Sequence, residues 1–212
     1  MMAMCGLFAM TKKEVYKKEA VDMMERILHW TGSGSSELGR PELSGAGNVS
    51  SLATPMCVLS LVTIMDSVGW SKAGLETRCI EEILSHVVRD GDMVLETVSK
   101  EDGQEVGGVA GRMVNPGHVI ECGWFLLDWA NRFLEMIVKT LLRSLFRNKD
   151  ATLAETAIKT FIEKPLEFGW DKIHDGIFYF LDADGNSKVF CKKKFILIHF
   201  SKVTVQLLWS GI

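Results

Sequence analysis

The chain has 212 residues, of which 47% are hydrophobic and 24% are charged, and its formal net charge is -3. This composition is typical of a globular protein of one large domain, and the slight negative charge argues against a nucleic-acid partner. No apolar run is long enough to cross a membrane, so we expect no membrane association. Cys5, Cys57, Cys79 and Cys122 lie within apolar helical patterns and form no CxxC pair. This favours buried thiols in a reducing, cytoplasmic compartment.

The first part of the chain is predicted to form helical hairpins joined by loops. Four segments have the apolar pattern of helices, with apolar residues at three- and four-residue steps or throughout. They are residues 2–10, 14–30, 52–68 and 72–89. His29 and His86 fall near the ends of two of these segments, where interaction with the helix C-terminus is expected. Residues 93–98 alternate in polarity and are predicted to pair with residues 106–109 as a hairpin.

Candidate chemistry concentrates in the stretch from Asn115 to Phe125. A Pro-Gly pair breaks the preceding chain, so His118 falls at the first turn of a new helix. Glu121 and Cys122 follow at three and four residues, on the face that carries His118. The N-terminus of a helix disfavours an imidazolium and so favours a neutral histidine. Two interpretations stay open: His118 caps or supports the helix start with Glu121 as its partner, or the two residues form a proton-transfer pair.

The second part of the chain continues this helix and then changes character. The helix of His118 is predicted to reach at least Trp129 and up to Phe146, and residues 152–168 form another, starting with a Thr152–Glu155 capping box. Residues 177–181 read as a strand, and residues 188–212 are basic and β-branched. The pattern predicts a mainly α fold, a partial toroid of helical hairpins with short β-hairpins at the loop end.

Several blocks of the sequence resemble the N-acylglucosamine 2-epimerase family, also known as renin-binding protein. The blocks are Ala20–Trp30, Leu38–Pro41, His86–Gly91, Gly111–Leu127 and Gly169–Asp184. The most specific block reads Asn-Pro-Gly-His, followed by Glu-Cys-Gly-Trp-Phe-Leu-Leu, and it contains His118 and Glu121.

The resemblance implies an (α/α)6 barrel whose funnel holds an amino sugar. It also implies interconversion of N-acetylglucosamine and N-acetylmannosamine, a step of amino-sugar and sialic acid metabolism. A proton leaves C2 beside the open-chain C1 aldehyde and returns to the opposite face, which requires two acid/base groups. His118 matches a catalytic histidine of the family motif, and Glu121 resembles a supporting or substrate-binding carboxylate. ATP is implied as an activator that is not consumed, and a homodimer and renin as partners. No metal is expected.

The chain also departs from the family pattern. Residues 133–146 look like an insertion, and residues 188–212 look unrelated. The catalytic Arg, second catalytic His and catalytic Glu of the family have no counterpart. We therefore expect a partial α/α-barrel domain at residues 1–187, a divergent tail at 188–212, and no useful epimerase activity of the chain alone. Two alternatives stay open: an inactive fragment that serves as a binding or dimerisation partner of the renin-binding type, and a mis-spliced gene-model product.

Overall fold

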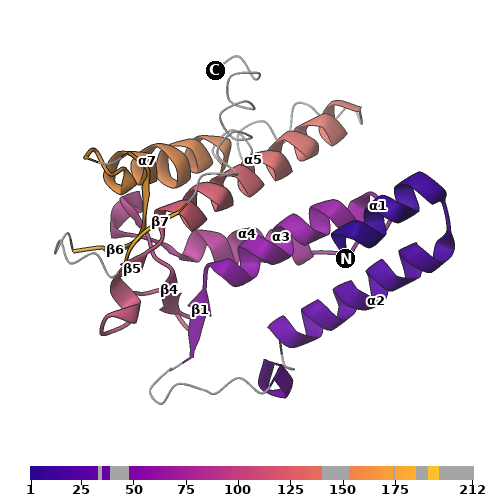
Figure 1. Cartoon of the computed structure of the whole chain (residues 1–212), viewed down its shortest axis with the longest axis horizontal. Coiled ribbons are helices and arrows are strands. Elements are labelled where there is room, and N and C mark those ends of the chain that lie inside the picture. The colour runs from indigo at the N-terminus through magenta and orange to yellow at the C-terminus, as the bar shows by residue number, and fades with distance from the viewer. Residues whose placement is uncertain (33–34, 39–47, 140–152, 174, 185–190, 196–212) are drawn as a thin grey trace. The chain divides into compact units, whose positions relative to one another are not determined.

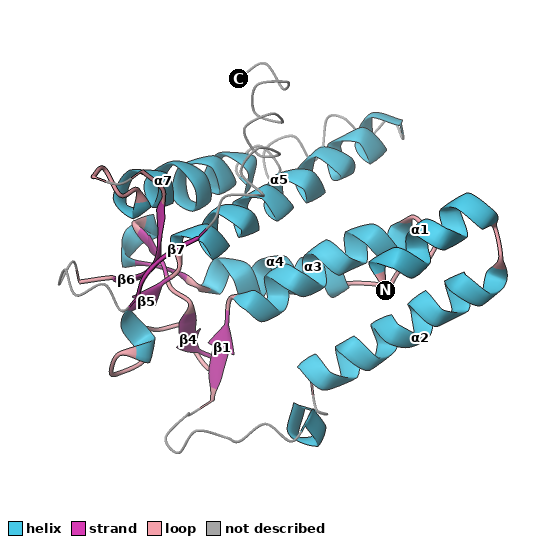
Figure 2. Ribbon diagram, in the orientation of Figure 1, coloured by secondary structure: helices cyan, strands magenta, loops and turns pink. Residues whose placement is uncertain are grey.

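A computed structural model of the chain describes residues 1–32, 35–38, 48–139, 153–173, 175–184 and 191–195 (Figure 1). The chain divides into two compact units, Met1–Leu84 and Ser85–Ile212. Most described residues are helical and the strands are short (Figure 2), which confirms the mainly α class. Closure into a toroid stays a prediction. Among these residues, no helix has both the length and the apolar character needed to cross a bilayer.

The first unit is built on helices that the periodicity predicted. Its elements are α1 (Met2–Thr11), α2 (Glu14–Thr31), η1 (Ser35–Leu38), β1 (Val49–Ser51), α3 (Ala53–Asp66) and α4 (Leu75–Ser85). α1 and α2 pack as a helical hairpin, and both contact α3. The helix predicted at residues 72–89 is shorter than expected. It ends before Val87 and Val88, because these β-branched residues pair in a strand instead.

The apolar faces of α1, α2 and α3 meet in the core of the first unit. Cys5, Met24 and Met65 are fully or almost fully buried there. The prediction of buried thiols holds for Cys5, Cys79 and Cys122 but is wrong for Cys57, which is exposed. The buried residues of α3 leave one side of the helix exposed, and Cys57 lies on that side. Apolar neighbours in the sequence were therefore not enough to predict burial.

Short strands open the second unit. They are β2 (Val87–Val88), β3 (Met93–Val94), β4 (Thr97–Ser99) and β5 (Met113–Val114), with the 3-10 turns η2 (Arg89–Gly91) and η3 (Ala110–Arg112) between them. The hairpin predicted between residues 93–98 and 106–109 is wrong in its register. β3 pairs back with β2 across the tight turn at Arg89–Gly91, and only Val98 bridges forward, to Glu105.

The remaining elements of the second unit surround one long helix. They are α5 (Pro116–Lys139), the π-helical η4 (Ala157–Glu163), α7 (Lys164–Gly169), β6 (Ile177–Asp182) and β7 (Cys191–Phe195). α5 packs on η4 at Gly123, where an added Cβ would lie 2.8 Å from Cβ of Phe161. β5, β6 and β7 form an antiparallel sheet in that order, and β6 contacts α5 and α7. This sheet therefore adjoins the helix that carries His118.

Several predictions extend beyond the described residues. α5 runs as far as Lys139, while residues 140–146 of the predicted insertion lie outside the described part, as does Thr152 of the predicted capping box. The expected domain boundary at residues 187 and 188 lies outside it too. Within the predicted tail, Cys191–Phe195 is strand β7 and pairs with β6. The predicted division into domains stays a prediction.

Candidate active site

The start of α5 places His118 in the first helical turn, as predicted. Asn115 precedes the helix and caps it, because its side-chain oxygen accepts the backbone N–H of His118 at 3.1 Å. Pro116 occupies the first helical position, where no backbone donor is needed. Asn115 is fully buried, so this cap is fixed within the unit. The Asn-Pro-Gly sequence thus holds the backbone of His118 in one position.

The ring of His118 pairs with Glu96, a residue that the sequence did not point to. Nδ1 of His118 lies 3.1 Å and 3.3 Å from the two carboxylate oxygens of Glu96. The His118 side chain is 26% exposed and that of Glu96 is 12% exposed, so the contact is shielded while the ring stays accessible. A carboxylate at Nδ1 favours the tautomer with the proton on that nitrogen. Nε2 then carries the lone pair and has no hydrogen-bond partner among the described residues.

The charges around His118 raise its pKa above the ordinary value of 6.5. The hydrogen bond that the ring donates to Glu96 is the main cause of the raised pKa, burial acts in the opposite direction, and the charges of Glu96 and Glu121 add to the rise. The net shift is opposite to the one expected from the helix N-terminus, because Glu96 is bonded to the ring, and the effect of the helix N-terminus itself stays a prediction.

Glu121 lies on α5 one turn after His118 and is half-buried. Its effect on the ring is the smaller, through-space one, because the carboxylate bonded to the ring is that of Glu96. Contact of Glu121 with a substrate stays a prediction. Cys122, which the helical spacing grouped with His118, is fully buried. The accessible face at the start of α5 therefore presents His118 and Glu121 without Cys122.

Hydrogen bonds hold the backbone at Glu96 and at the residue before it. The N–H of Glu96 donates to the carbonyl of Met113 at 2.9 Å, and the N–H of Leu95 donates to the carbonyl of His86 at 3.0 Å. His86 directly follows α4, at a helix end as expected, and its ring is fully buried, with Nδ1 2.8 Å from the Leu95 carbonyl. Glu96 therefore projects its carboxylate from a held bend between β3 and β4.

The chemistry available at this site is proton transfer. A half-buried imidazole with one nitrogen held by a carboxylate and the other unpaired is the arrangement of a general base. Among the described residues, no group of three or more His, Cys, Asp or Glu side chains could hold a metal ion. The charged groups around His118 thus support acid/base chemistry by this residue.

The sequence matches the family described as N-acylglucosamine 2-epimerase (GlcNAc 2-epimerase) over residues 70–202. This range contains Glu96, His118 and Glu121. It also spans residues 133–146 and part of 188–212, whose origin stays a prediction.

Curated relatives named N-acylglucosamine 2-epimerase are similar to most of the chain. The protein from Mus musculus is 42% identical over 188 residues, which cover 87% of this chain and 41% of the relative. The protein from Homo sapiens is 42% identical over 187 residues, covering 86% of this chain and 40% of the relative. The Bos taurus protein is 41% identical over 188 residues, with 87% and 41% covered. The chain thus spans about two fifths of the length of these relatives.

Proposed function

Because the chain belongs to the N-acylglucosamine 2-epimerase family, we propose that His118 is a general base that removes the C2 proton of an N-acylated amino sugar. The Glu96–His118 pair is the observation that supports this role. It supplies a ring nitrogen that can accept a proton and a carboxylate that stabilises the resulting charge. The substrates would be N-acetylglucosamine and N-acetylmannosamine.

The electrostatics of the pair suit this reaction. The C2 proton of the open-chain sugar is weakly acidic because the adjacent C1 aldehyde can accommodate the electrons as an enolate. When Nε2 of His118 takes this proton, the ring becomes an imidazolium beside the ionised carboxylate of Glu96. A base with a raised pKa accepts such a proton more readily. Glu121, one turn along α5, is proposed to bind the sugar or to support the ring.

Epimerisation requires more than this one base. Return of the proton from His118 regenerates the starting sugar, and delivery to the opposite face of C2 yields the epimer. That delivery needs a second acid/base group, and we expect none in the chain. The proposed contribution of the chain is therefore exchange of the C2 proton on one face of the sugar.

Exchange of the C2 proton with solvent tests this role directly. The purified chain is incubated in D₂O with N-acetylmannosamine and with ATP, the expected activator, and deuterium at C2 is followed by NMR. We expect incorporation by the wild type and a loss of roughly 10²- to 10⁴-fold in His118→Gln, because a glutamine cannot act as the base. His29→Gln is the matched control, since His29 is an exposed residue paired with Glu37 in the first unit.

The outcomes separate the hypotheses. Equal exchange in the wild type and in His118→Gln contradicts the proposal. No exchange by a folded wild-type chain also contradicts it and favours the alternative of an inactive binding or dimerisation partner. Exchange with accumulation of N-acetylglucosamine would support the role of His118 and would show that the chain contains a second acid/base group.

A further inference from the structure

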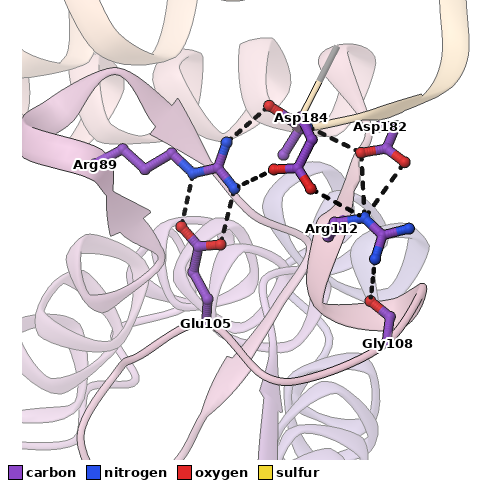
Figure 3. A network of polar contacts seen from close by, with 7 residues as sticks. Arg89, Glu105, Gly108, Arg112, Asp182 and Asp184 are labelled. Carbon is purple, nitrogen blue, oxygen red and sulfur yellow. Dashed lines mark hydrogen bonds and ion pairs between the residues drawn. The ribbon is translucent and has the colours of Figure 1, made fainter. Parts of the chain in front are cut away.

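Two arginines and three carboxylates form a connected cluster in the second unit (Figure 3). The members are Arg89, Glu105, Arg112, Asp182 and Asp184, here named the arginine clasp. We propose that the arginine clasp positions Glu96 against His118. This inference rests on the proposed function of His118 and extends it to residues that do not touch the ring.

Arg89 uses its whole guanidinium group in the clasp. Nε and Nη2 donate to the two carboxylate oxygens of Glu105 at 2.7 Å and 2.9 Å, a bidentate geometry. Nη2 also donates to Oδ1 of Asp184 at 2.7 Å, and Nη1 donates to the carbonyl of Ala183 at 2.8 Å. Arg89 therefore ties the turn after β2 to the turn after β6, although the two are far apart in sequence.

Arg112 completes the clasp from the other side. Its Nε lies 3.3 Å and 3.4 Å from the carboxylate oxygens of Asp182 and 3.3 Å from Oδ2 of Asp184. Asp184 is therefore shared between the two arginines, as Figure 3 shows. The backbone joins in, because the N–H of Ala183 donates to the carbonyl of Arg112 at 2.8 Å. The side chain of Asp182 is only 5% exposed, so this end of the clasp is shielded from water.

The backbone at Arg89 indicates that the clasp holds a strained turn. Arg89 and Asp90 have φ values of 55° and 56°, in the left-handed region that side chains with a Cβ disfavour. Each such residue costs on the order of 1–2 kcal/mol, so a consecutive pair persists only where other contacts hold it. The ion pairs of Arg89 provide those contacts.

The clasp reaches Glu96 through the two segments that flank it. Arg89 directly follows β2, whose partner β3 ends two residues before Glu96. Arg112 directly precedes Met113, whose carbonyl accepts the N–H of Glu96. Tying Arg89 to Arg112 therefore fixes the two neighbours of the segment that carries Glu96.

The link between Arg89 and Arg112 also supports His118. β5 ends at Val114, next to Asn115, which caps α5 and accepts the N–H of His118. Both Glu96 and His118 are thus one short segment away from Arg112. A change in the clasp is expected to alter the distance between carboxylate and ring before it unfolds the unit.

Titration of His118 in the full chain tests the positioning role without any turnover. The charged groups that act on the ring are Glu96, from the segment after β3, and Glu121, on α5. In Arg112→Gln we expect the NMR titration midpoint of His118 to fall toward the ordinary value of about 6.5, because Glu96 is less well placed. C2 exchange should fall as well, by up to about 100-fold, the effect that a small misplacement can have.

Matched variants separate positioning from folding. Arg112→Lys keeps a positive charge near Asp182. The His118 titration midpoint of this variant should therefore lie between those of Arg112→Gln and the wild type. Arg78→Gln removes an exposed arginine of α4 in the first unit and should leave the midpoint unchanged. Asp184→Asn removes the carboxylate that both arginines share and provides a second, milder test.

An unchanged midpoint in a folded Arg112→Gln chain would overturn the inference. Loss of the fold in both Arg112→Gln and Asp184→Asn, with Arg78→Gln still folded, would also overturn it, because the clasp would then be needed for folding alone. The midpoint is read in the absence of sugar. A wild-type chain that fails to exchange the C2 proton therefore leaves this test intact.

Discussion

The two units differ in where they place their polar groups. The ion pairs of the first unit, Lys18–Asp22, His29–Glu37 and Lys72–Glu25, are all exposed. Among its described residues the buried polar side chain is Ser50, whereas the second unit buries His86, Glu96, Asn115 and Thr160. Burying such groups is unfavourable unless they are paired, so their concentration in one unit calls for a reason. Proton transfer by His118 is a reason that fits.

Backbone strain follows the same division. Among the described residues, the first unit has one non-glycine residue with positive φ, Lys12, which ends α1 as an ordinary left-handed cap. The second unit has Arg89, Asp90 and Asp175 in this region. Buried Nδ2 of Asn115 also has no hydrogen-bond partner among the described residues. Local rules are broken mainly in the unit that carries His118, as expected where function constrains a sequence.

Glycine substitutions provide the largest expected contrast in stability between the units. At Gly123 an added Cβ would lie 2.8 Å from Cβ of Phe161 and 2.9 Å from Cγ1 of Ile162. Gly123→Ala is therefore expected to lower the free energy of unfolding by roughly 1–3 kcal/mol, the usual cost of overpacking. At Gly6 in α1 an added Cβ would meet nothing within 4 Å beyond its own stretch of helix, so Gly6→Ala should raise the free energy of unfolding by about 0.5–1 kcal/mol.

Urea unfolding of both variants measures this contrast. A Gly123→Ala chain as stable as wild type would show that α5 and η4 are not closely packed. A destabilised Gly6→Ala chain would show that the exposed side of α1 is covered by a partner in solution.

The next effect concerns the pH dependence of the Glu96–His118 pair. Glu96→Gln removes the main cause of the raised His118 pKa, so that pKa should fall. The acid limb of C2 exchange should move to lower pH, because the ring loses its proton earlier, and the rate above that limb should drop with the weaker base. Glu121→Gln should move the limb in the same direction but less, since Glu121 contributes only its charge. An equal or larger shift of the acid limb in Glu121→Gln would contradict the assignment of Glu96 as the partner of His118.

The same pair predicts how stability changes with pH. Because the folded-state pKa of His118 is raised, its contribution to stability is fully present below the unfolded value of 6.5 and is lost as pH rises through the folded value. The wild type should therefore exceed Glu96→Gln in unfolding free energy by more at about pH 6 than at about pH 8. Melting both proteins at the two pH values measures this difference. An equal difference in unfolding free energy at both pH values would contradict the pairing of Glu96 with His118.

Sequence periodicity predicted the helices and the position of His118, but not its partner. Helical spacing relates residues three and four apart, which is why it proposed Glu121 for a ring that in fact bonds Glu96, 22 residues upstream. That contact depends on the pairing of β3 with β2 and of Glu96 with Met113, and neither pairing is local. A signal was nevertheless present. Glu96 is the one charged residue in the run Met93–Val98, and a charge within an apolar segment requires a partner when the segment is buried.

The ends of elements were harder to predict for a related reason. The helical pattern of α4 continues in sequence through Val88, but Val87 and Val88 pair with Val94 and Met93. Tertiary pairing decided between helix and strand for these residues, because the intrinsic preferences are small.

The smallest expected effect comes from a comparison of two lysines. Lys72 in the first unit lies 3.4 Å from Glu25, and both side chains are about half exposed, at 48% and 51%. Lys72→Gln should change the free energy of unfolding by less than about 0.5 kcal/mol, and less still at high salt, because exposed pairs are solvated and screened. Lys164 in the second unit has a similar exposure of 37%, but it donates to the carbonyl of Gly91 at 2.7 Å as well as to Asp92.

Lys164→Gln therefore removes a charged hydrogen bond to the backbone next to the strained Asp90, and it should be the more destabilising of the two changes. Its effect should also persist at high salt, since a bond to a carbonyl is less sensitive to screening than an exposed ion pair. Melting both variants at low and high salt measures the difference. If Lys72→Gln proved as costly as Lys164→Gln, surface pairs in the first unit would matter as much as those that hold the turns of the second. The contrast between the units would then lie in burial alone.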